Sequence, residues 1–288
     1  MMRLRKHLQI SLVLLAGALV TACSPLFFWP DSVLRQTPGA YGFSYDEVIV
    51  TSNDEQLYGW HVRPEVTNNE TPPGLIHYLY GNAQNMSAHF RSVAWLVEQG
   101  WEVFTLDYRG YGRSTGEPDV PGIHRDASVG LEWAASKARE RDLPLVVLGQ
   151  SLGASAAITM LAKAKEPAID ALILDSPFAG YRRMVREKMR LNWFTGLFAQ
   201  PASLTVPDRY SPIRHMSELP DIPILIVHGC ADRVIPCEHS EALVDAAAHH
   251  ITLWKDPEAD HTEMLLSSEW RDKVLGWLES NVYGDFGS

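Results

Sequence analysis

The stretch that most constrains the fold of this chain runs from residue 145 to residue 157. Its apolar start, residues 145–148, predicts a short buried strand, and its alanine-rich end predicts a helix. Between them stands Gly-Gln-Ser-Leu-Gly, in which Gly149 and Gly153 lack the Cβ atoms that would collide in a sharp strand-to-helix turn. Such a turn lifts the side chain of Ser151 clear of the backbone, beside the free N–H groups at the start of the helix. Ser151 is therefore the candidate nucleophile.

Strands and helices alternate along most of the remaining chain. Strands are predicted at 45–51, 57–62, 75–80, 101–106, 171–174, 224–228 and 251–254, and helices at 87–99, 126–139, 238–248 and 261–281. Strands that alternate with helices of about ten or more residues pair in parallel through right-handed crossovers, with helices on both faces of the sheet. A turn signal separates the first two strands, which predicts an antiparallel hairpin at the edge. The pattern predicts an α/β fold with a mostly parallel central sheet.

One segment, residues 178–212, is too long for a single crossover helix and interrupts this alternation. It is rich in arginine, methionine and aromatic residues. It is either an ordinary crossover with an amphipathic helix or a short helical lid over Ser151 that supplies an apolar pocket, and we favour the lid. The predicted organisation is a leader at 1–22, a tether at 23–40 and one folded domain at 41–284.

The composition limits the classes of partner and cofactor. A chain of 288 residues with 46% hydrophobic and 21% charged residues can build an ample core. The formal net charge of −10 argues against a nucleic acid as partner, because phosphate backbones bind basic surfaces. The sequence contains no phosphate-binding loop, no glycine-rich dinucleotide motif after a strand and no Cys/His cluster at metal-ligand spacing. We therefore expect neither a cofactor nor a metal.

The amino terminus has the pattern of an export signal. Arg3, Arg5 and Lys6 precede an uncharged, mostly apolar run at 8–20, which is too short to span a bilayer comfortably. The run ends in Val-Thr-Ala-Cys, which resembles a bacterial lipobox and makes Cys23 the expected lipidation site. This predicts a lipoprotein on the periplasmic side of a bacterial cell envelope, since more than one acyl chain anchors a protein stably. An uncleaved membrane anchor and a plain secretory signal are the alternatives.

The other two cysteines, Cys230 and Cys237, would then lie in an oxidising compartment, where a disulfide persists. A bridge between them would close a loop of about eight residues, so its effect on chain entropy would be smaller than that of a long loop. The sequence leaves both alternatives open, a disulfide or two buried thiols.

Five motifs occur in the order that the α/β-hydrolase superfamily shows. They are Gly81-Asn82-Ala83, Asp107-Tyr108-Arg109-Gly110-Tyr111-Gly112, the turn around Ser151, Asp175-Ser176-Pro177-Phe178 and His228-Gly229-Cys230-Ala231-Asp232. Through them nearly the whole chain after the leader resembles that superfamily. It looks most like the branch of small serine hydrolases with monoglyceride-lipase-like, serine-aminopeptidase-like and acyl-thioesterase members. The resemblance implies the α/β-hydrolase fold and the chain order nucleophile, acid, base.

Within that order the resemblance implies that Asp232 is the acid, since it follows a buried strand by a short loop. His261 is the implied base, since it follows the last strand and opens the closing helix. Asp175 is the alternative acid, because some members of the fold carry the acid one strand earlier. His228 stands at a strand end and is expected to be structural. In this arrangement His261 takes the proton of Ser151, while Asp232 holds the imidazole tautomer.

The resemblance also implies an oxyanion hole made of two backbone N–H groups, those of Asn82 and Leu152. Many relatives carry a histidine before the glycine of the first loop, whereas this chain carries Tyr80. We expect this difference to change the hydrogen bonds that support the loop, and not the N–H groups that the loop donates.

The expected activity is the hydrolysis of carboxylic esters or thioesters, through an acyl-enzyme on Ser151. The expected partners are a small acyl substrate and a membrane reached through the lipid anchor. A peptidase or amidase with the same three residues is the nearest alternative. A non-catalytic lipoprotein that uses the fold as a scaffold is the third. The oligomeric state stays open.

Overall fold

The computed structural model describes residues 28–65, 71–164, 169–191 and 193–283, so the predicted leader and Cys23 lie outside the described residues. An eight-stranded sheet has the order β1-β2-β4-β3-β5-β6-β7-β8. Its strands are β1 (Ser44–Ser52), β2 (Glu55–Arg63), β3 (Leu75–Leu79), β4 (Glu102–Leu106), β5 (Leu145–Gln150), β6 (Ala171–Asp175), β7 (Ile224–Gly229) and β8 (Thr252–Asp256). The pairs β1·β2 and β2·β4 are antiparallel, and all the other pairs are parallel. This confirms the predicted α/β-hydrolase fold with an antiparallel hairpin at its amino-terminal edge.

The central strands form the core of the domain. Every residue of β3, β4, β5, β6 and β7 is buried, which is why these strands are nearly continuous apolar runs rather than alternating ones. The edge strand β1 buries only Val48 and Ser52. The carboxyl ends of β5, β6 and β7 therefore lie side by side above a rigid core, where loops can position side chains.

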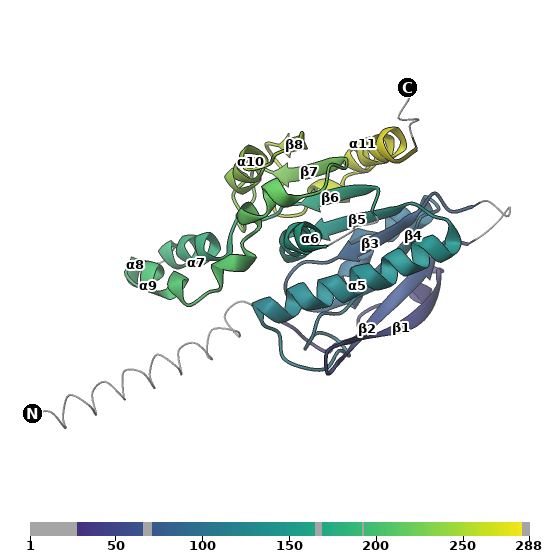
Figure 1. The fold of residues 1–288 in the computed structure, drawn as a ribbon, viewed down its shortest axis with the longest axis horizontal. Helices are drawn as coiled ribbons and strands as arrows, with labels where there is room; N and C mark the ends of the chain where they lie inside the picture. The colour runs from purple at the N-terminus through teal and green to yellow at the C-terminus, as the bar shows by residue number, and fades with distance from the viewer. Residues whose placement is uncertain (1–27, 66–70, 165–168, 192, 284–288) are drawn as a thin grey trace, which may run out of the picture.

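Helices surround the sheet, and α5 and α6 pass in front of it in Figure 1. The helices are α3 (Met86–His89), α4 (Ala94–Glu98), α5 (Val120–Arg141), α6 (Leu152–Lys163), α7 (Tyr181–Arg190), α8 (Trp193–Gly196), α9 (Ala199–Leu204), α10 (Glu238–Asp245) and α11 (Ser268–Leu278). Shorter helical turns are η1 (Pro38–Tyr41), η2 (Phe90–Ser92), η3 (Asp208–Tyr210), η4 (Pro212–Arg214), η5 (Met216–Glu218), η6 (Met264–Leu266) and η7 (Glu279–Tyr283). No helix in the described part of the chain is long and apolar enough to cross a bilayer.

Two helices differ from their predicted bounds for local reasons. The predicted helix at 87–99 is split into α3, η2 and α4, because Val93 has a φ of −122° and leaves helical geometry. The helix predicted at 126–139 starts earlier, as α5. Asp119 caps it by accepting a hydrogen bond from the Gly122 N–H at 2.7 Å, a capping signal that the apolar periodicity does not contain.

The insertion between β6 and β7 contains α7, α8 and α9. These helices lie together on the left of Figure 1, beyond the end of the sheet. They are joined to the core at the start of the insertion, where the Phe178 N–H donates to Ser155 Oγ at 3.0 Å. Since Ser155 belongs to α6, the insertion is attached to the helix that follows Ser151.

The described part of the predicted tether packs on the domain. Phe28 is buried, and the Gln84 N–H donates to the Trp29 carbonyl at 2.8 Å. The Asp31 N–H donates back to the Gln84 carbonyl at 3.1 Å. This segment therefore lies against the loop that follows β3, the loop that carries Asn82.

Candidate active site

Ser151 occupies a strained turn between β5 and α6. Its φ of 54° and ψ of −112° place a non-glycine residue in the left-handed half of backbone space, which costs about 1–3 kcal/mol. Both neighbouring glycines are required, because a Cβ at Gly153 would lie 2.0 Å from the Leu79 carbonyl oxygen and one at Gly149 would lie 2.5 Å from Ala154 Cα. Ser151 is half-buried, so its hydroxyl stays accessible.

His261 lies between Ser151 and Asp232. Its Nε2 is 3.0 Å from Ser151 Oγ, and its Nδ1 is 2.6 Å from Asp232 Oδ2. A carboxylate only accepts, so Nδ1 carries the proton, and Nε2 is left to accept from the serine hydroxyl. The three side chains that the sequence singled out thus form one hydrogen-bonded chain.

His261 does not open the closing helix, as the sequence predicted. It stands in a loop, and α11 begins only at Ser268. Asp260 Oδ1 accepts hydrogen bonds from the N–H groups of His261 (2.8 Å) and Arg233 (3.0 Å), and Thr262 has a positive φ of 57°. These contacts turn the chain away from helical geometry and tie the loop of His261 to that of Asp232.

Asp232 is held by neighbours on both oxygens. Its Oδ1 accepts from the N–H groups of Val234 (2.6 Å) and Ile235 (2.7 Å). Burial acts to raise the pKa of Asp232, but hydrogen bonds from His228 and His261 outweigh it and lower the pKa below its usual range. The carboxylate therefore stays ionised and can stabilise a positive charge on His261.

Asp175, the alternative acid, has different partners. It ends β6, is fully buried, and accepts hydrogen bonds from Gln150 Nε2 (3.1 Å) and Ser176 Oγ (2.9 Å). Burial raises the pKa of Asp175. The imidazole of His261 is thus bonded to Asp232, one strand later.

The two predicted N–H donors lie on segments that flank Ser151. Leu152 is the first residue of α6, so its N–H belongs to the first turn, whose N–H groups have no partner within the helix. Asn82 follows Gly81, at which an added Cβ would lie 3.4 Å from Ser151 Cβ. The loop therefore passes close enough to Ser151 for its backbone to face a reacting group.

Contacts to the side chain of Asn82 hold that loop in place. Asn82 Oδ1 accepts from the N–H of Ala83 (2.8 Å), the hydroxyl of Tyr111 (2.7 Å) and the N–H of Trp29 (3.3 Å). Tyr111 belongs to a motif noted in the sequence, but nothing there linked it to Asn82. Its contact depends on two loops that meet only in the folded chain.

Tyr80, which replaces the more usual histidine, is bonded on both sides. Its hydroxyl donates to Asp107 Oδ1 at 2.9 Å, and its carbonyl accepts from the Tyr108 hydroxyl at 3.0 Å. Asp107 also accepts from the Met86 N–H at 2.7 Å, and burial raises its pKa to about 6. The buried pair of Tyr80 and Asp107 thus supports the loop that carries Asn82.

Comparison with known proteins assigns the chain to a family. A model described as serine aminopeptidase, S33, matches residues 70–220, which is more than half of the chain. The YfhR protein of Escherichia coli strain K12, described only as uncharacterized, is 30% identical over 239 residues, covering 82% of this chain and 79% of that protein. The chain belongs to the serine aminopeptidase S33 family. It is therefore a hydrolase of the α/β-hydrolase type.

Solved structures share the fold of this S33 hydrolase. The esterase Pf2001 of Pyrococcus furiosus superposes with a TM-score of 0.72 at 23% identity, covering 89% of this chain and 98% of that one. The acylaminoacyl peptidase of Pyrococcus horikoshii superposes with a TM-score of 0.64 at 15% identity, covering 88% of this chain and 45% of that one. At these identities the likeness concerns the fold alone.

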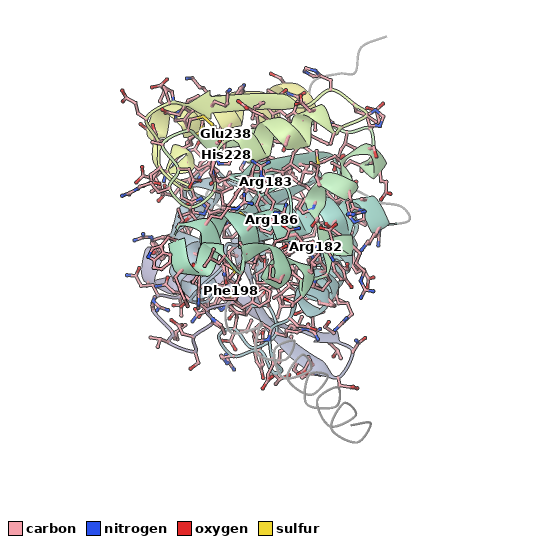
Figure 2. All side chains as sticks on the ribbon, turned by 90° about the vertical axis from the view of Figure 1, so that its left-hand side faces the viewer. Arg182, Arg183, Arg186, Phe198, His228 and Glu238 are labelled. Atoms are coloured by element: carbon pink, nitrogen blue, oxygen red, sulfur yellow. A yellow bond between two sulfur atoms is a disulfide. The ribbon has the colours of Figure 1, made fainter. Side chains whose placement is uncertain are left out.

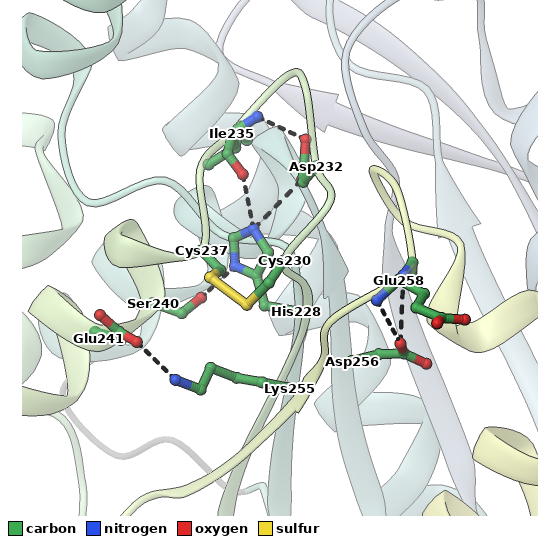
Figure 3. Close-up of a disulfide and its surroundings, with 11 residues drawn as sticks. His228, Cys230, Asp232, Ile235, Cys237, Ser240, Glu241, Lys255, Asp256 and Glu258 are labelled. Atoms are coloured by element: carbon green, nitrogen blue, oxygen red, sulfur yellow. Dashed lines mark hydrogen bonds and ion pairs between the residues drawn. A yellow bond between two sulfur atoms is a disulfide. The ribbon is translucent and has the colours of Figure 1, made fainter.

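Sequence reasoning named two cysteines and His228 near Asp232 in this S33 hydrolase, but not the contacts that they make around it. Figure 3 shows a disulfide between Cys230 and Cys237, one of the two alternatives left open by the sequence, and it closes the loop that carries Asp232. His228, expected to be structural, reaches from β7 to the same loop, where its Nε2 donates to the Ile235 carbonyl at 2.9 Å. Among the described residues no group of three or more His, Cys, Asp or Glu side chains is arranged to hold a metal.

Proposed function

We propose that the protein is a serine hydrolase that cleaves carboxylic ester or thioester bonds through an acyl-enzyme on Ser151. The observation that supports this most is the 3.0 Å contact of Ser151 Oγ with His261 Nε2, together with the bond from the opposite ring nitrogen to Asp232. A hydroxyl is a weak nucleophile until an adjacent base, itself oriented by a third group, takes its proton.

In the first half of the reaction, Ser151 Oγ forms a bond to the acyl carbon while its proton passes to His261 Nε2. The carbonyl electron pair moves onto oxygen, and the N–H groups of Leu152 and Asn82 stabilise that oxyanion. When the intermediate collapses, the alcohol or thiol leaves with the proton of His261. Water then repeats the sequence on the acyl-enzyme and releases the carboxylic acid. Asp232 stabilises the imidazolium in both halves.

A fluorophosphonate probe tests the nucleophile, because it reacts only with an activated serine. We expect it to label the wild type at Ser151 and to leave Ser151→Ala unlabelled. His261→Ala should fold normally and lower kcat by several orders of magnitude. If the folded wild type and Ser151→Ala behave alike toward the probe, the chain is a non-catalytic scaffold.

Peptide or amide cleavage is the second candidate. The family's description, serine aminopeptidase, favours it, and the shared fold does not decide the question, because both an esterase and an acylaminoacyl peptidase have it. The rate on p-nitrophenyl esters compared with that on aminoacyl anilides separates the two. We expect at least a hundredfold higher kcat/KM on the esters, and the opposite order would make the protein an amidase.

We further propose that the enzyme is anchored to a bacterial cell envelope through lipid on Cys23. The support is the basic start, the apolar run and the cysteine that ends it, all within the first 23 residues. Radiolabelled palmitate should enter the wild-type protein in a bacterial host and be absent from Cys23→Ala. Label in the variant would contradict the proposal.

The insertion at 178–212 is proposed as a lid over Ser151. Its support is the attachment of Phe178 to α6 and the position of α7–α9 beyond the end of the sheet. Replacing residues 193–204 with a short Gly-Ser linker should lower kcat/KM for long acyl chains more than for acetate. An unchanged chain-length profile would contradict the lid.

A further inference from the structure

A cavity of about 450 Å³ lies beside α7, and none of the proposed catalytic residues lines it. Its lining includes Arg182, Arg183 and Arg186 from α7, and Arg214 from η4. The first three stand at positions i, i+1 and i+4 of the helix, and this spacing brings them to one side of it. Figure 2 shows these three arginines together on the face turned toward the viewer. Distant segments thus place four guanidinium groups around one space.

Two of these four cations are paired. Arg183 Nε is 2.8 Å from Glu187 Oε1, and Arg214 is bonded to Asp208. Within the described residues, neither Arg182 nor Arg186 makes an ion pair. Arg182 Nε donates to the Val206 carbonyl at 3.2 Å, and Asp208, which also lines the cavity, interacts electrostatically with both Arg182 and Arg214. Four arginines thus face two carboxylates, Glu187 and Asp208. The cavity therefore carries about two positive charges more than its neighbours neutralise.

These unpaired arginines are half-buried, so water screens them less than it screens surface cations. A partly desolvated guanidinium binds an oxyanion strongly, and its planar fork suits the tetrahedral oxygens of a phosphate. The chain as a whole is acidic, with a net charge of −10, so this cationic cavity has the opposite sign to the overall charge. The cavity thus selects for an anionic group.

An exposed apolar cluster lies on α8 and the residues around it. It consists of Leu191, Trp193, Phe194, Leu197 and Phe198, of which Trp193 is 81% exposed and Leu197 is 70% exposed. The ring centroids of Trp193 and Phe194 are 5.9 Å apart, as are those of Phe194 and Phe198, so the three aromatic rings pack in a row. Figure 2 shows Phe198 on the same face as the three arginines of α7. The cationic cavity and the apolar cluster lie on the same face of the molecule, and the two suit the two ends of an amphiphile.

We propose that this cavity binds the phosphate group of an anionic lipid, whose apolar chain lies against the apolar cluster. The guanidinium groups of Arg182 and Arg186 hold the phosphate oxygens. Trp193 and Phe198 contact the chain. The site takes a ligand in its own right and does not depend on hydrolysis at Ser151.

The test is calorimetric titration with dodecyl phosphate below its micelle concentration. Arg182→Gln/Arg186→Gln should weaken its binding by at least tenfold, since each lost charge-assisted hydrogen bond accounts for about that factor. Arg190→Gln removes a charge from the exposed end of the same helix and should change the affinity less than twofold. The far-ultraviolet circular dichroism spectra of all variants should match that of the wild type, which controls for folding.

Two further ligands identify the source of the phosphate. Glycerol phosphate should bind at least tenfold more weakly than dodecyl phosphate, and Trp193→Ala should weaken only the latter. If glycerol phosphate and dodecyl phosphate bind equally well, this is a site for soluble phosphate esters, and the proposed lipid ligand is wrong. Dodecyl maltoside has the same chain without the charge. If it binds as tightly as dodecyl phosphate, and if Arg182→Gln/Arg186→Gln does not change its binding, the surface is apolar without anion selectivity, which would overturn the proposed site.

Discussion

His228 Nε2 lies 3.3 Å from Asp232 Oδ2, so the carboxylate that faces His261 has a second imidazole beside the same oxygen. His228 is fully buried, and its Nδ1 lies 2.5 Å from Ser240 Oγ on α10. Ser240 therefore connects the first turn of α10 to the acid through one histidine. Figure 3 shows this chain of contacts beside the disulfide. Asp232, which is bonded to His261, is thus linked to buried residues of β7 and α10.

His228→Leu should reduce kcat about tenfold with little change in KM, because Asp232 loses one of the groups that orient it. The low-field proton resonance of the His261 Nδ1–H bond should broaden in the variant, which a purely structural role would not cause. His249→Leu, at an exposed histidine, serves as the control. Unchanged kcat together with an unchanged resonance would remove His228 from the site.

Replacing both Cys230 and Cys237 by Ser should lower the free energy of unfolding by about 2 kcal/mol, as expected for a loop of this length. Activity should fall several-fold, since Asp232 lies inside that loop. Dithiothreitol should lower wild-type activity to the level of the variant and leave the variant unaffected. Equal inhibition of both proteins would show that the reductant acts elsewhere.

Gly153→Ala should abolish folding or lower the free energy of unfolding by more than about 3 kcal/mol, because the new Cβ would lie 2.0 Å from the Leu79 carbonyl oxygen. Gly276→Ala provides the matched comparison. It lies in α11 with open space around the new Cβ and should stabilise the protein by about 0.5–1 kcal/mol. Urea denaturation measures both, and a tolerated alanine at 153 would refute the close approach.

Asp107→Asn should change how stability depends on pH. Burial raises the pKa of Asp107 to about 6, above its ordinary 3.8, so the folded state keeps the proton to higher pH than the unfolded state. The wild type's free energy of unfolding therefore loses up to about 3 kcal/mol from this group as the pH rises from about 4 to about 6. Asparagine does not titrate and can still accept from Tyr80 and Met86.

Urea titrations of Asp107→Asn and the wild type at several values between pH 4 and pH 7.5 measure this effect. The variant should gain stability relative to the wild type through that window and stay level above it. A difference that does not vary with pH would mean that the carboxyl group titrates normally.

The parts of this protein that the sequence predicted are those decided by short-range sterics. The turn at Ser151 follows from two glycines within two residues of it, because a Cβ at either position meets nearby backbone. The hairpin of β1 and β2 and the buried central strands follow from local turn residues and apolar runs. Such features depend on neighbours along the chain, and those are visible in a sequence.

Only the tertiary structure decided the features that depend on contacts between distant segments. The sequence left open a disulfide or two thiols at Cys230 and Cys237, and the cysteines are bonded because a loop after β7 folds back on itself. The closing helix starts late because Asp260 is bonded to Arg233, which lies 27 residues earlier. Arginines on α7 and η4 line one cavity because the fold brings these two distant segments together. A hydrogen bond or charge pair between remote residues leaves no periodic trace in the sequence, because its geometry exists only once the sheet has brought the loops together.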